Sequence, residues 1–113
     1  MRKPGTDNDN VQMSDVLCDF CRSEWTEGLQ MVEGHQGSTI CGRCLAEAYR
    51  SLLLRKEGAE HSGSKCVLCL ENRAEPAWRS AAHPEAAICK RCTNQSAAVL
   101  AKDKELGWVK PKA

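Results

Sequence analysis

The order of polar and apolar residues in the first half of this chain predicts two short strands followed by a helix. Residues 29–32 and 38–40 flank the glycine-containing run 33–37, an arrangement typical of a β-hairpin. Apolar residues then recur at i, i+3, i+4, i+7 and i+8, which is the spacing of one helix face. They are Leu45, Ala48, Tyr49, Leu52 and Leu53. We expect this helix to end before Gly58, because glycine commonly follows the last helical turn.

The second half of the chain predicts the same elements in the same order. Residues 77–79 and 86–88 lie on either side of a turn that contains Pro84. The helix that follows, ending near Gly107, keeps the register of the first one but carries smaller side chains on its inward face. The inward positions are Thr93, Ser96, Ala97, Leu100 and Ala101. The two helices therefore differ in the apolar surface that they need to bury.

This similarity between the halves extends to individual residues at an offset of 48, the separation of Cys18 from Cys66. The matched pairs are Glu27 with Glu75, His35 with His83, Ile40 with Ile88, Arg43 with Arg91, Leu52 with Leu100, and Lys56-Glu57 with Lys104-Glu105. Matches spread along a whole unit indicate a duplicated module. We therefore expect a flexible tail (1–13), module one (14–57), a linker (58–64), module two (65–106) and a C-terminal tail (107–113).

The eight cysteines follow the same repeat and predict two zinc sites. Each module has two Cys-x-x-Cys pairs separated by 19 residues, a spacing that suits four thiolates around one tetrahedral zinc ion. The first site comprises Cys18, Cys21, Cys41 and Cys44, and the second comprises Cys66, Cys69, Cys89 and Cys92. A cross-braced assignment, with alternate pairs sharing an ion, is the alternative that the duplication disfavours. Disulfides, redox-active pairs and a rubredoxin-like iron site are further alternatives.

Four cysteines leave no ligand position for water or substrate, so we expect structural zinc and no enzymatic activity. A unit of this size buries too little apolar surface to fold securely without a metal or another staple. The matching His35 and His83 lie in predicted turns and are expected to be solvated rather than ligands.

Composition and charge limit the compartments and the classes of partner that we expect for the protein. The N-terminal residues are polar and no run approaches the length of a membrane helix, so we expect a cytoplasmic protein without a membrane partner. Residues 1–60 carry seven Lys and Arg against ten Asp and Glu, whereas residues 61–113 carry nine against five. The modules thus have opposite charge, and a single strongly basic face of the kind that binds nucleic acid is not evident.

Three segments around the first cysteines resemble the N-terminal zinc-binding domain of the ClpX family. They are Leu17-Cys-Asp-Phe-Cys21, Met31-Val-Glu-Gly34 and Ile40-Cys-Gly-Arg-Cys-Leu45. The resemblance implies a treble-clef zinc finger (knuckle, hairpin, helix) for residues 14–57 and, through Ile88 and the Cys-x-x-Cys pairs, for 65–106. The fold class expected is therefore a small zinc-stapled α+β protein with two tandem treble clefs. Arg22 and Leu70 stand where the family usually has glycine.

In that family the domain dimerises and recruits adaptors and substrates to an unfoldase, whose ATPase module this sequence lacks. The resemblance therefore implies a protein-interaction module, an adaptor or substrate-recognition element with an adaptor, substrate or unfoldase as its protein partner. A duplicated self-pairing domain predicts an internal pseudo-dimer, with a homodimer as the alternative. Nucleic-acid binding and transcription regulation form a second hypothesis, because several regulators share this cysteine spacing. Redox-linked zinc release is a third.

Overall fold

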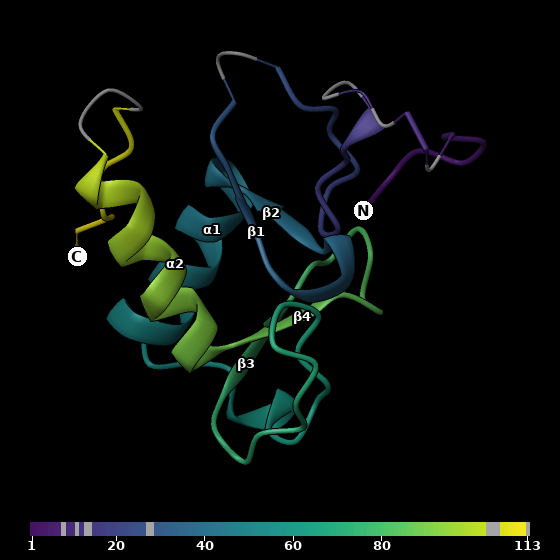
Figure 1. Ribbon diagram of the computed structural model, residues 1–113. Coiled ribbons are helices and arrows are strands. Elements are labelled where there is room, and N and C mark those ends of the chain that lie inside the picture. The colour runs from purple at the N-terminus through teal and green to yellow at the C-terminus, as the bar shows by residue number, and fades with distance from the viewer. Residues whose placement is uncertain (8, 11, 13–14, 27–28, 104–106, 113) are drawn as a thin grey trace.

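The computed structural model describes residues 1–7, 9–10, 12, 15–26, 29–103 and 107–112, which form two small α+β units in sequence (Figure 1). In module one, strand β1 (Met31–Glu33) pairs antiparallel with β2 (Thr39–Cys41), and a short 3-10 turn, η2 (His35–Gly37), joins them. Helix α1 (Gly42–Tyr49) follows β2 without a break and continues as a π-helical turn, η3 (Arg50–Leu54). The predicted hairpin and helix are both present.

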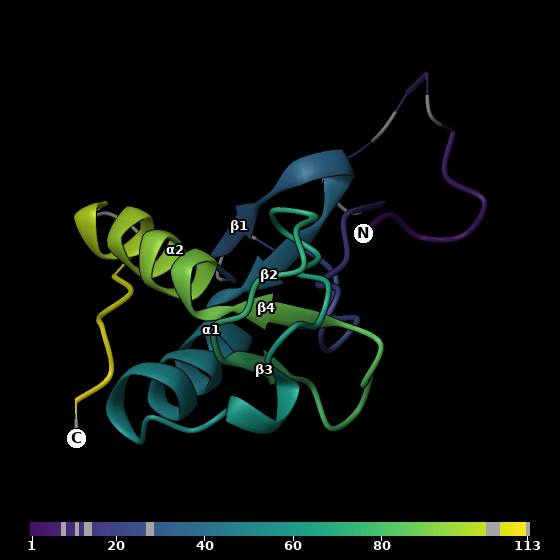
Figure 2. The ribbon, with the colours of Figure 1, turned by 90° about the horizontal axis from the view of Figure 1, so that it is seen from below.

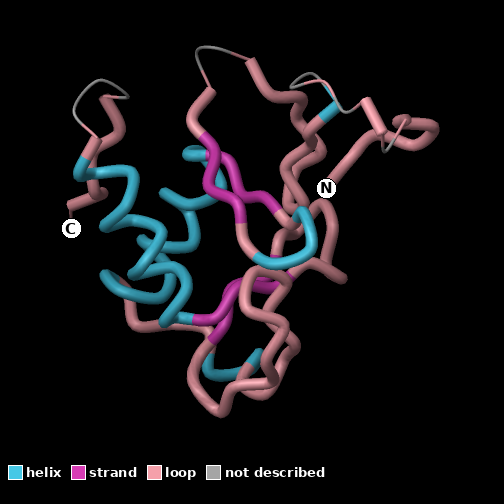
Figure 3. Tube along the Cα trace, viewed as in Figure 1, coloured by secondary structure: helices cyan, strands magenta, loops and turns pink. Residues whose placement is uncertain are grey.

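Module two repeats this order. A 3-10 turn, η4 (Ala59–His61), precedes it, strand β3 (Ala77–Arg79) pairs antiparallel with β4 (Ala87–Cys89), and helix α2 (Lys90–Lys102) begins directly after β4. Figure 3 shows that the strands form two separate hairpins and that the other described residues are helix and loop. Among the described residues, no helix combines the length and the apolar character needed to cross a membrane. The repeat matches at Glu27 and at Lys104-Glu105 lie outside the described residues.

The predicted helix faces are the faces that the protein buries. In α1 and η3, Leu45, Ala48 and Leu52 are at most 1% exposed. In α2 the metal-site cysteine Cys92 is buried together with Thr93, Ser96, Ala97 and Leu100. The hydroxyl of Thr93 donates to the Cys89 carbonyl at 3.0 Å, so this polar side chain enters the core with its hydrogen bond made inside the helix. Small side chains on α2 and leucines on α1 therefore share one interior.

The two hairpins are equivalent in pairing but differ in length. The turn between β1 and β2 spans residues 34–38, and the turn between β3 and β4 spans residues 80–86, which is two residues longer. Strand β4 therefore matches β2 at the offset of the cysteines, whereas β3 matches β1 at an offset two residues smaller. His35 and His83 therefore keep equivalent positions before β2 and β4, where their carbonyls accept from the Ser38 N–H at 3.1 Å and the Ala86 N–H at 2.9 Å, but they lie at different distances from β1 and β3.

The modules pack against each other through a single hydrophobic core. Buried residues from both halves form one cluster, among them Phe20, Ile40, Leu45, Leu68, Ile88 and Leu100. Helices α1 and α2 lie against each other on one side of the hairpins (Figure 2). Neither module encloses its core alone.

Reciprocal contacts between the hairpin turns and the first Cys-x-x-Cys loops complete this packing. The His35 N–H, in the turn of module one, donates to the Leu68 carbonyl at 2.9 Å. The Ser80 hydroxyl, in the turn of module two, donates to the Phe20 carbonyl at 2.5 Å. Phe20 and Leu68 match in the repeat, so the turn of each module contacts the same position of the other module's loop. The two contacts are therefore reciprocal between the modules.

The segments outside the hairpins and helices also contact the core. Gly58 has a φ of +93°, and a Cβ at this position would lie 2.5 Å from the Ala77 carbonyl oxygen, so glycine meets both a backbone and a packing requirement. In the C-terminal tail, the indole N–H of Trp108 donates to the Gly42 carbonyl at 2.9 Å. The segment 58–64 therefore packs against module two at Gly58, and the segment 107–112 packs against module one at Trp108.

Candidate metal centres

The first Cys-x-x-Cys pair of each module lies in a tight loop that repeats hydrogen bond by hydrogen bond. The Arg22 N–H donates to the Cys18 carbonyl at 2.9 Å, and the Leu70 N–H donates to the Cys66 carbonyl at 2.8 Å. Arg22 and Leu70 have φ values of 63° and 62°, in the left-handed region. A residue there reverses the chain after the second cysteine, which explains why glycine would also suit this position. Isolated bridges between Leu17 and Glu24 and between Lys65 and Asn72 close the two loops.

The second pair of each module lies where a strand becomes a helix. Cys41 and Cys89 are the last residues of β2 and β4 and the N-caps of α1 and α2, with extended backbone in both. Cys44 and Cys92 follow in the first helical turn. Backbone N–H groups at a helix start favour anionic sulfur, and the Cys92 N–H donates to Cys89 Sγ at 3.4 Å.

The fold brings the eight cysteines together as the two predicted sets of four. Cys18, Cys21, Cys41 and Cys44 form one cluster, and Cys66, Cys69, Cys89 and Cys92 form the other, with the sulfur atoms of each cluster within 4.8 Å of one another. The cross-braced alternative is thus not the arrangement adopted. Cys21 Sγ and Cys41 Sγ are 3.7 Å apart, and Cys69 Sγ and Cys89 Sγ are 4.0 Å apart. Four sulfurs at about 2.3 Å from a tetrahedral zinc ion are about 3.8 Å from one another.

The metal-free thiols interact strongly within each cluster. The thiol–thiolate hydrogen bond with Cys18, followed by that with Cys44, lowers the pKa of Cys41, while the Cys18 pKa rises to about 11 through the same bond with Cys41. In module two the hydrogen bond with Cys89 lowers the pKa of Cys66, and that with Cys66 raises the Cys89 pKa to about 12. Without a metal, each cluster thus stabilises one thiolate and disfavours deprotonation of a second thiol. A divalent cation at the centre offsets this mutual repulsion.

Cationic side chains outside the ligands also fit anionic clusters. The guanidinium of Arg73 lies beside Cys69, which raises the Arg73 pKa, and its buried Nε has no hydrogen-bond partner among the described residues. An unpaired buried N–H is costly, and an anionic metal–thiolate centre beside it offsets that cost. In module one, the Arg43 Nη2 donates to the Ser23 hydroxyl at 2.9 Å, and that hydroxyl is 3.2 Å from Cys21 Sγ.

The donor set, the spacing of the sulfurs and the surrounding positive charge all fit one divalent ion per cluster. Four sulfur ligands are typical of structural zinc, and they occupy all four tetrahedral positions. Such a site supplies folding free energy and orders the loop, the strand end and the helix start that carry the ligands. It leaves no position for a reacting water molecule.

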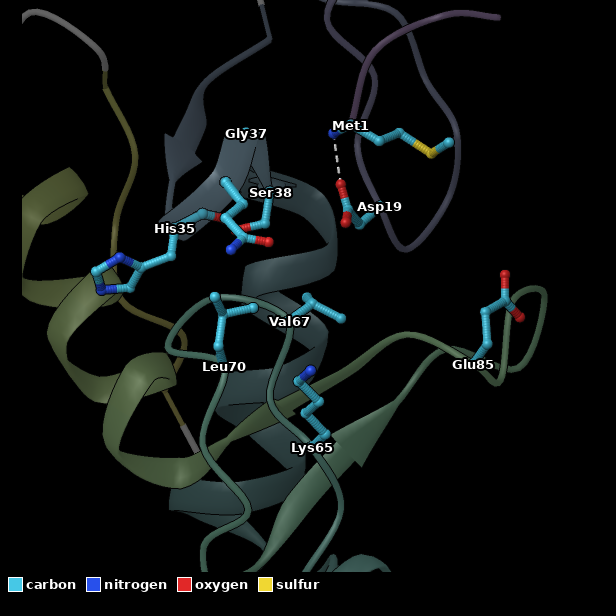
Figure 4. Close-up of a pocket in the computed structure, with 10 residues that line it drawn as sticks. Met1, Asp19, His35, Gly37, Ser38, Lys65, Val67, Leu70 and Glu85 are labelled. Atoms are coloured by element: carbon cyan, nitrogen blue, oxygen red, sulfur yellow. Dashed lines mark hydrogen bonds and ion pairs between the residues drawn. The ribbon is translucent and has the colours of Figure 1, made fainter.

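The two candidate histidines lie outside these clusters. His83 Nδ1 is 3.8 Å from Glu85, and Glu85 also pairs with Arg22 at 2.7 Å across the module boundary. His35 lies at the edge of a cavity of about 350 Å³ between the turn of module one and the first loop of module two. Figure 4 shows Ser38 and Gly37 on one side of this cavity and Val67 and Leu70 on the other, with the His35 ring directed away from it toward α2. Polar and apolar residues both line this cavity, and none of the cysteines is among them.

The sequence interpretation identified every cysteine of the clusters but missed Arg73 and Ser23. Neither position repeats: Trp25 and Glu71 occupy the matching places in the other module. The repeat therefore gives no signal for them. Comparison with known family models, curated proteins and solved structures found no match to this chain.

Proposed function

We propose that this chain is a tandem pair of treble-clef zinc fingers that acts as a protein-interaction module. The observation that supports this most directly is the closed four-cysteine cluster at the junction of loop, hairpin and helix in each module. Metal held in this way stabilises structure, so function belongs to the surfaces that the metal orders. On this proposal the protein is not an enzyme.

The order of elements supports the treble-clef assignment. Each module has a tight Cys-x-x-Cys loop, an antiparallel hairpin and a helix that begins within the second Cys-x-x-Cys pair. The positive φ at Arg22 and Leu70 fits the position at which the resembling family has glycine. These features favour the sequence relationship to the ClpX-type zinc-binding domain.

We further propose that the two modules form an internal pseudo-dimer. The reciprocal bonds from His35 to Leu68 and from Ser80 to Phe20 support this proposal, because the turn of each module contacts the matching loop position of the other. In a single-copy relative, the same surfaces would pair two chains. Here they are occupied within one chain, which leaves the outer faces of α1, α2 and the tails for a partner.

The partner we propose is an adaptor, an unfolded substrate or the unfoldase of a Clp-type system. The test measures binding of a labelled, permanently unfolded protein and of a Clp-type unfoldase to the zinc-loaded chain, by fluorescence anisotropy. We expect saturable binding to at least one of them, which disappears after chelation of the metal. Binding to neither, or binding that chelation leaves unchanged, would contradict the proposal.

Duplex DNA serves as the third probe in the same assay. A nucleic-acid-binding protein would bind the duplex with an affinity that falls steeply with salt. Tighter binding to DNA than to either protein would replace our proposal with the nucleic-acid hypothesis.

A further inference from the structure

A small apolar pocket with a cationic rim lies at the C-terminal end of the first helix. Its volume is about 260 Å³, and it is lined by Arg50, Leu54, Arg55 and Lys112. Pockets that bind drug-sized molecules are typically about 300–1,000 Å³, so this one suits a single side chain. Leu54 and the aliphatic stems that arginine and lysine carry account for an apolar lining, while the charged ends of such side chains favour water.

The π-helical turn explains why two arginines reach the same pocket. The Arg55 N–H donates to the Arg50 carbonyl at 2.8 Å, an i→i+5 bond. In a regular α-helix, residues five apart point about 140° away from each other. The wider π turn brings Arg50 and Arg55 to one side, around Leu54.

The C-terminal tail supplies the third cation. Figures 1 and 2 show the tail returning from the end of α2 toward η3. The Trp108 indole holds this path through its 2.9 Å bond to Gly42, and Lys112 reaches the pocket. Val109, next to Trp108 in this tail, is 72% exposed.

The charge around the pocket is positive even though both arginines have carboxylate neighbours. Arg50 pairs with Glu47 at 3.0 Å and Arg55 pairs with Glu57 at 2.8 Å, and all four side chains are about half exposed. Exposed pairs of this kind contribute little and exchange readily, and a guanidinium has five donors. Residues 47–57 and 107–112 together carry five Lys and Arg against two Glu.

We infer that this pocket binds an acidic linear peptide of a partner protein, with one aliphatic side chain inserted over Leu54 and flanking carboxylates on Arg50, Arg55 and Lys112. The inference rests on the proposed function and names a surface and a partner chemistry for it. The apolar wall favours a peptide over a purely electrostatic ligand, because a phosphate backbone would not use Leu54.

The test uses the full zinc-loaded chain and a fluorescein-labelled eight-residue peptide of Asp and Glu with one central leucine, in anisotropy titrations at low salt. We expect saturable binding that weakens at least tenfold when Arg55→Glu and Lys112→Glu are combined. The control is Lys102→Glu, which reverses an exposed lysine that does not line this pocket, and it should change the affinity by less than twofold.

A second pair of measurements tests insertion over Leu54. Leu54→Ser should weaken binding of the leucine peptide at least fivefold while leaving a peptide with serine at the centre almost unchanged. An equal loss of affinity for both peptides would contradict insertion of the leucine side chain over Leu54. Tighter binding of a single-stranded oligonucleotide than of the peptide would contradict a peptide as the partner. If an unfolded protein or unfoldase binds normally to the Arg55→Glu, Lys112→Glu variant, this inference fails and the proposed function stands.

Discussion

Gly34→Ala tests the docking of one module on the other at a single atom. A Cβ on Gly34 would lie 2.7 Å from both the Cα and the carbonyl oxygen of Leu68, whereas ordinary contact begins near 3.4 Å. The φ of Gly34 is −113°, which any residue adopts, so the substitution adds no left-handed strain. The new methyl group therefore acts only by pushing the turn of module one away from the first loop of module two.

The expected cost follows from two terms. Overpacking of a well-packed contact costs about 1–3 kcal/mol. Separating the backbones also weakens the His35 N–H to Leu68 carbonyl bond, which is worth about 0.5–1.5 kcal/mol. We therefore expect the free energy of unfolding to fall by about 2–4 kcal/mol, a large part of the 5–15 kcal/mol typical of a small domain.

The assay is chemical denaturation of the zinc-loaded protein, followed by circular dichroism and tryptophan fluorescence, together with amide NMR shifts. Gly37→Ala in the same turn is the control, because its Cβ meets open space and only its positive φ of +75° carries a cost. Gly34→Ala should shift amides around Leu68 in module two, and Gly37→Ala should not. A destabilisation below about 0.5 kcal/mol, with no shift in module two, would refute the docking contact.

Three further predictions address the remaining contacts and the metal. Ser80→Ala should lower the free energy of unfolding by about 1–3 kcal/mol, because it leaves the Phe20 carbonyl without its hydrogen-bond donor. Ser62→Ala, at an exposed serine, is the control and should have no effect in the same denaturation assay. Equal effects of the two substitutions would contradict the bond from Ser80 to Phe20. Trp108→Ala should cost about 1–3 kcal/mol through the lost bond to Gly42 and lost packing, and an unchanged thermal midpoint would contradict the packed tail. Zinc-loaded protein should lose metal and stability as pH falls, because each ion needs four thiolates. In metal-free protein the two partners of one thiol–thiolate bond act oppositely: the Cys18 pKa, raised from 9.0 to about 11, removes stability as pH rises above 9, and the lowered Cys41 pKa removes stability as pH falls below 9. Zinc content and the thermal midpoint of the loaded protein, followed together as pH falls, check the metal-dependent loss, and a midpoint that falls while zinc stays bound would contradict it.

The sequence predicted the features that depend on local spacing. Zinc geometry restricts where four thiolates can lie. The spacing of the cysteines that begin at Cys18 and at Cys66 therefore predicted which four cysteines form each cluster. Helical periodicity likewise predicted that Leu52 and Leu100 face the interior, and both are at most 2% exposed. The duplication disfavoured the cross-braced alternative for the same reason: each unit carries a complete ligand set.

Features that depend on tertiary contact were beyond the sequence. A comparison of the two halves without gaps does not reveal the two extra residues in the second hairpin turn. Because of them, Ser80 contacts Phe20, whereas the sequence match of His35 is His83. The buried Nε of Arg73 and the bond from Trp108 to Gly42 each join segments with no shared pattern. The sequence indicated only a C-terminal tail after module two, and the fold alone places Lys112 beside η3.

Native mass spectrometry of the purified chain counts the metal ions that it holds. We expect two zinc ions per chain. A Cys18→Ser, Cys21→Ser variant should retain one ion, held by module two, and a Cys66→Ser, Cys69→Ser variant should retain one, held by module one. Binding of fewer than two ions by the parent chain, loss of both ions in either variant through shared ligation, or a mass that shows four disulfides in place of metal would contradict it.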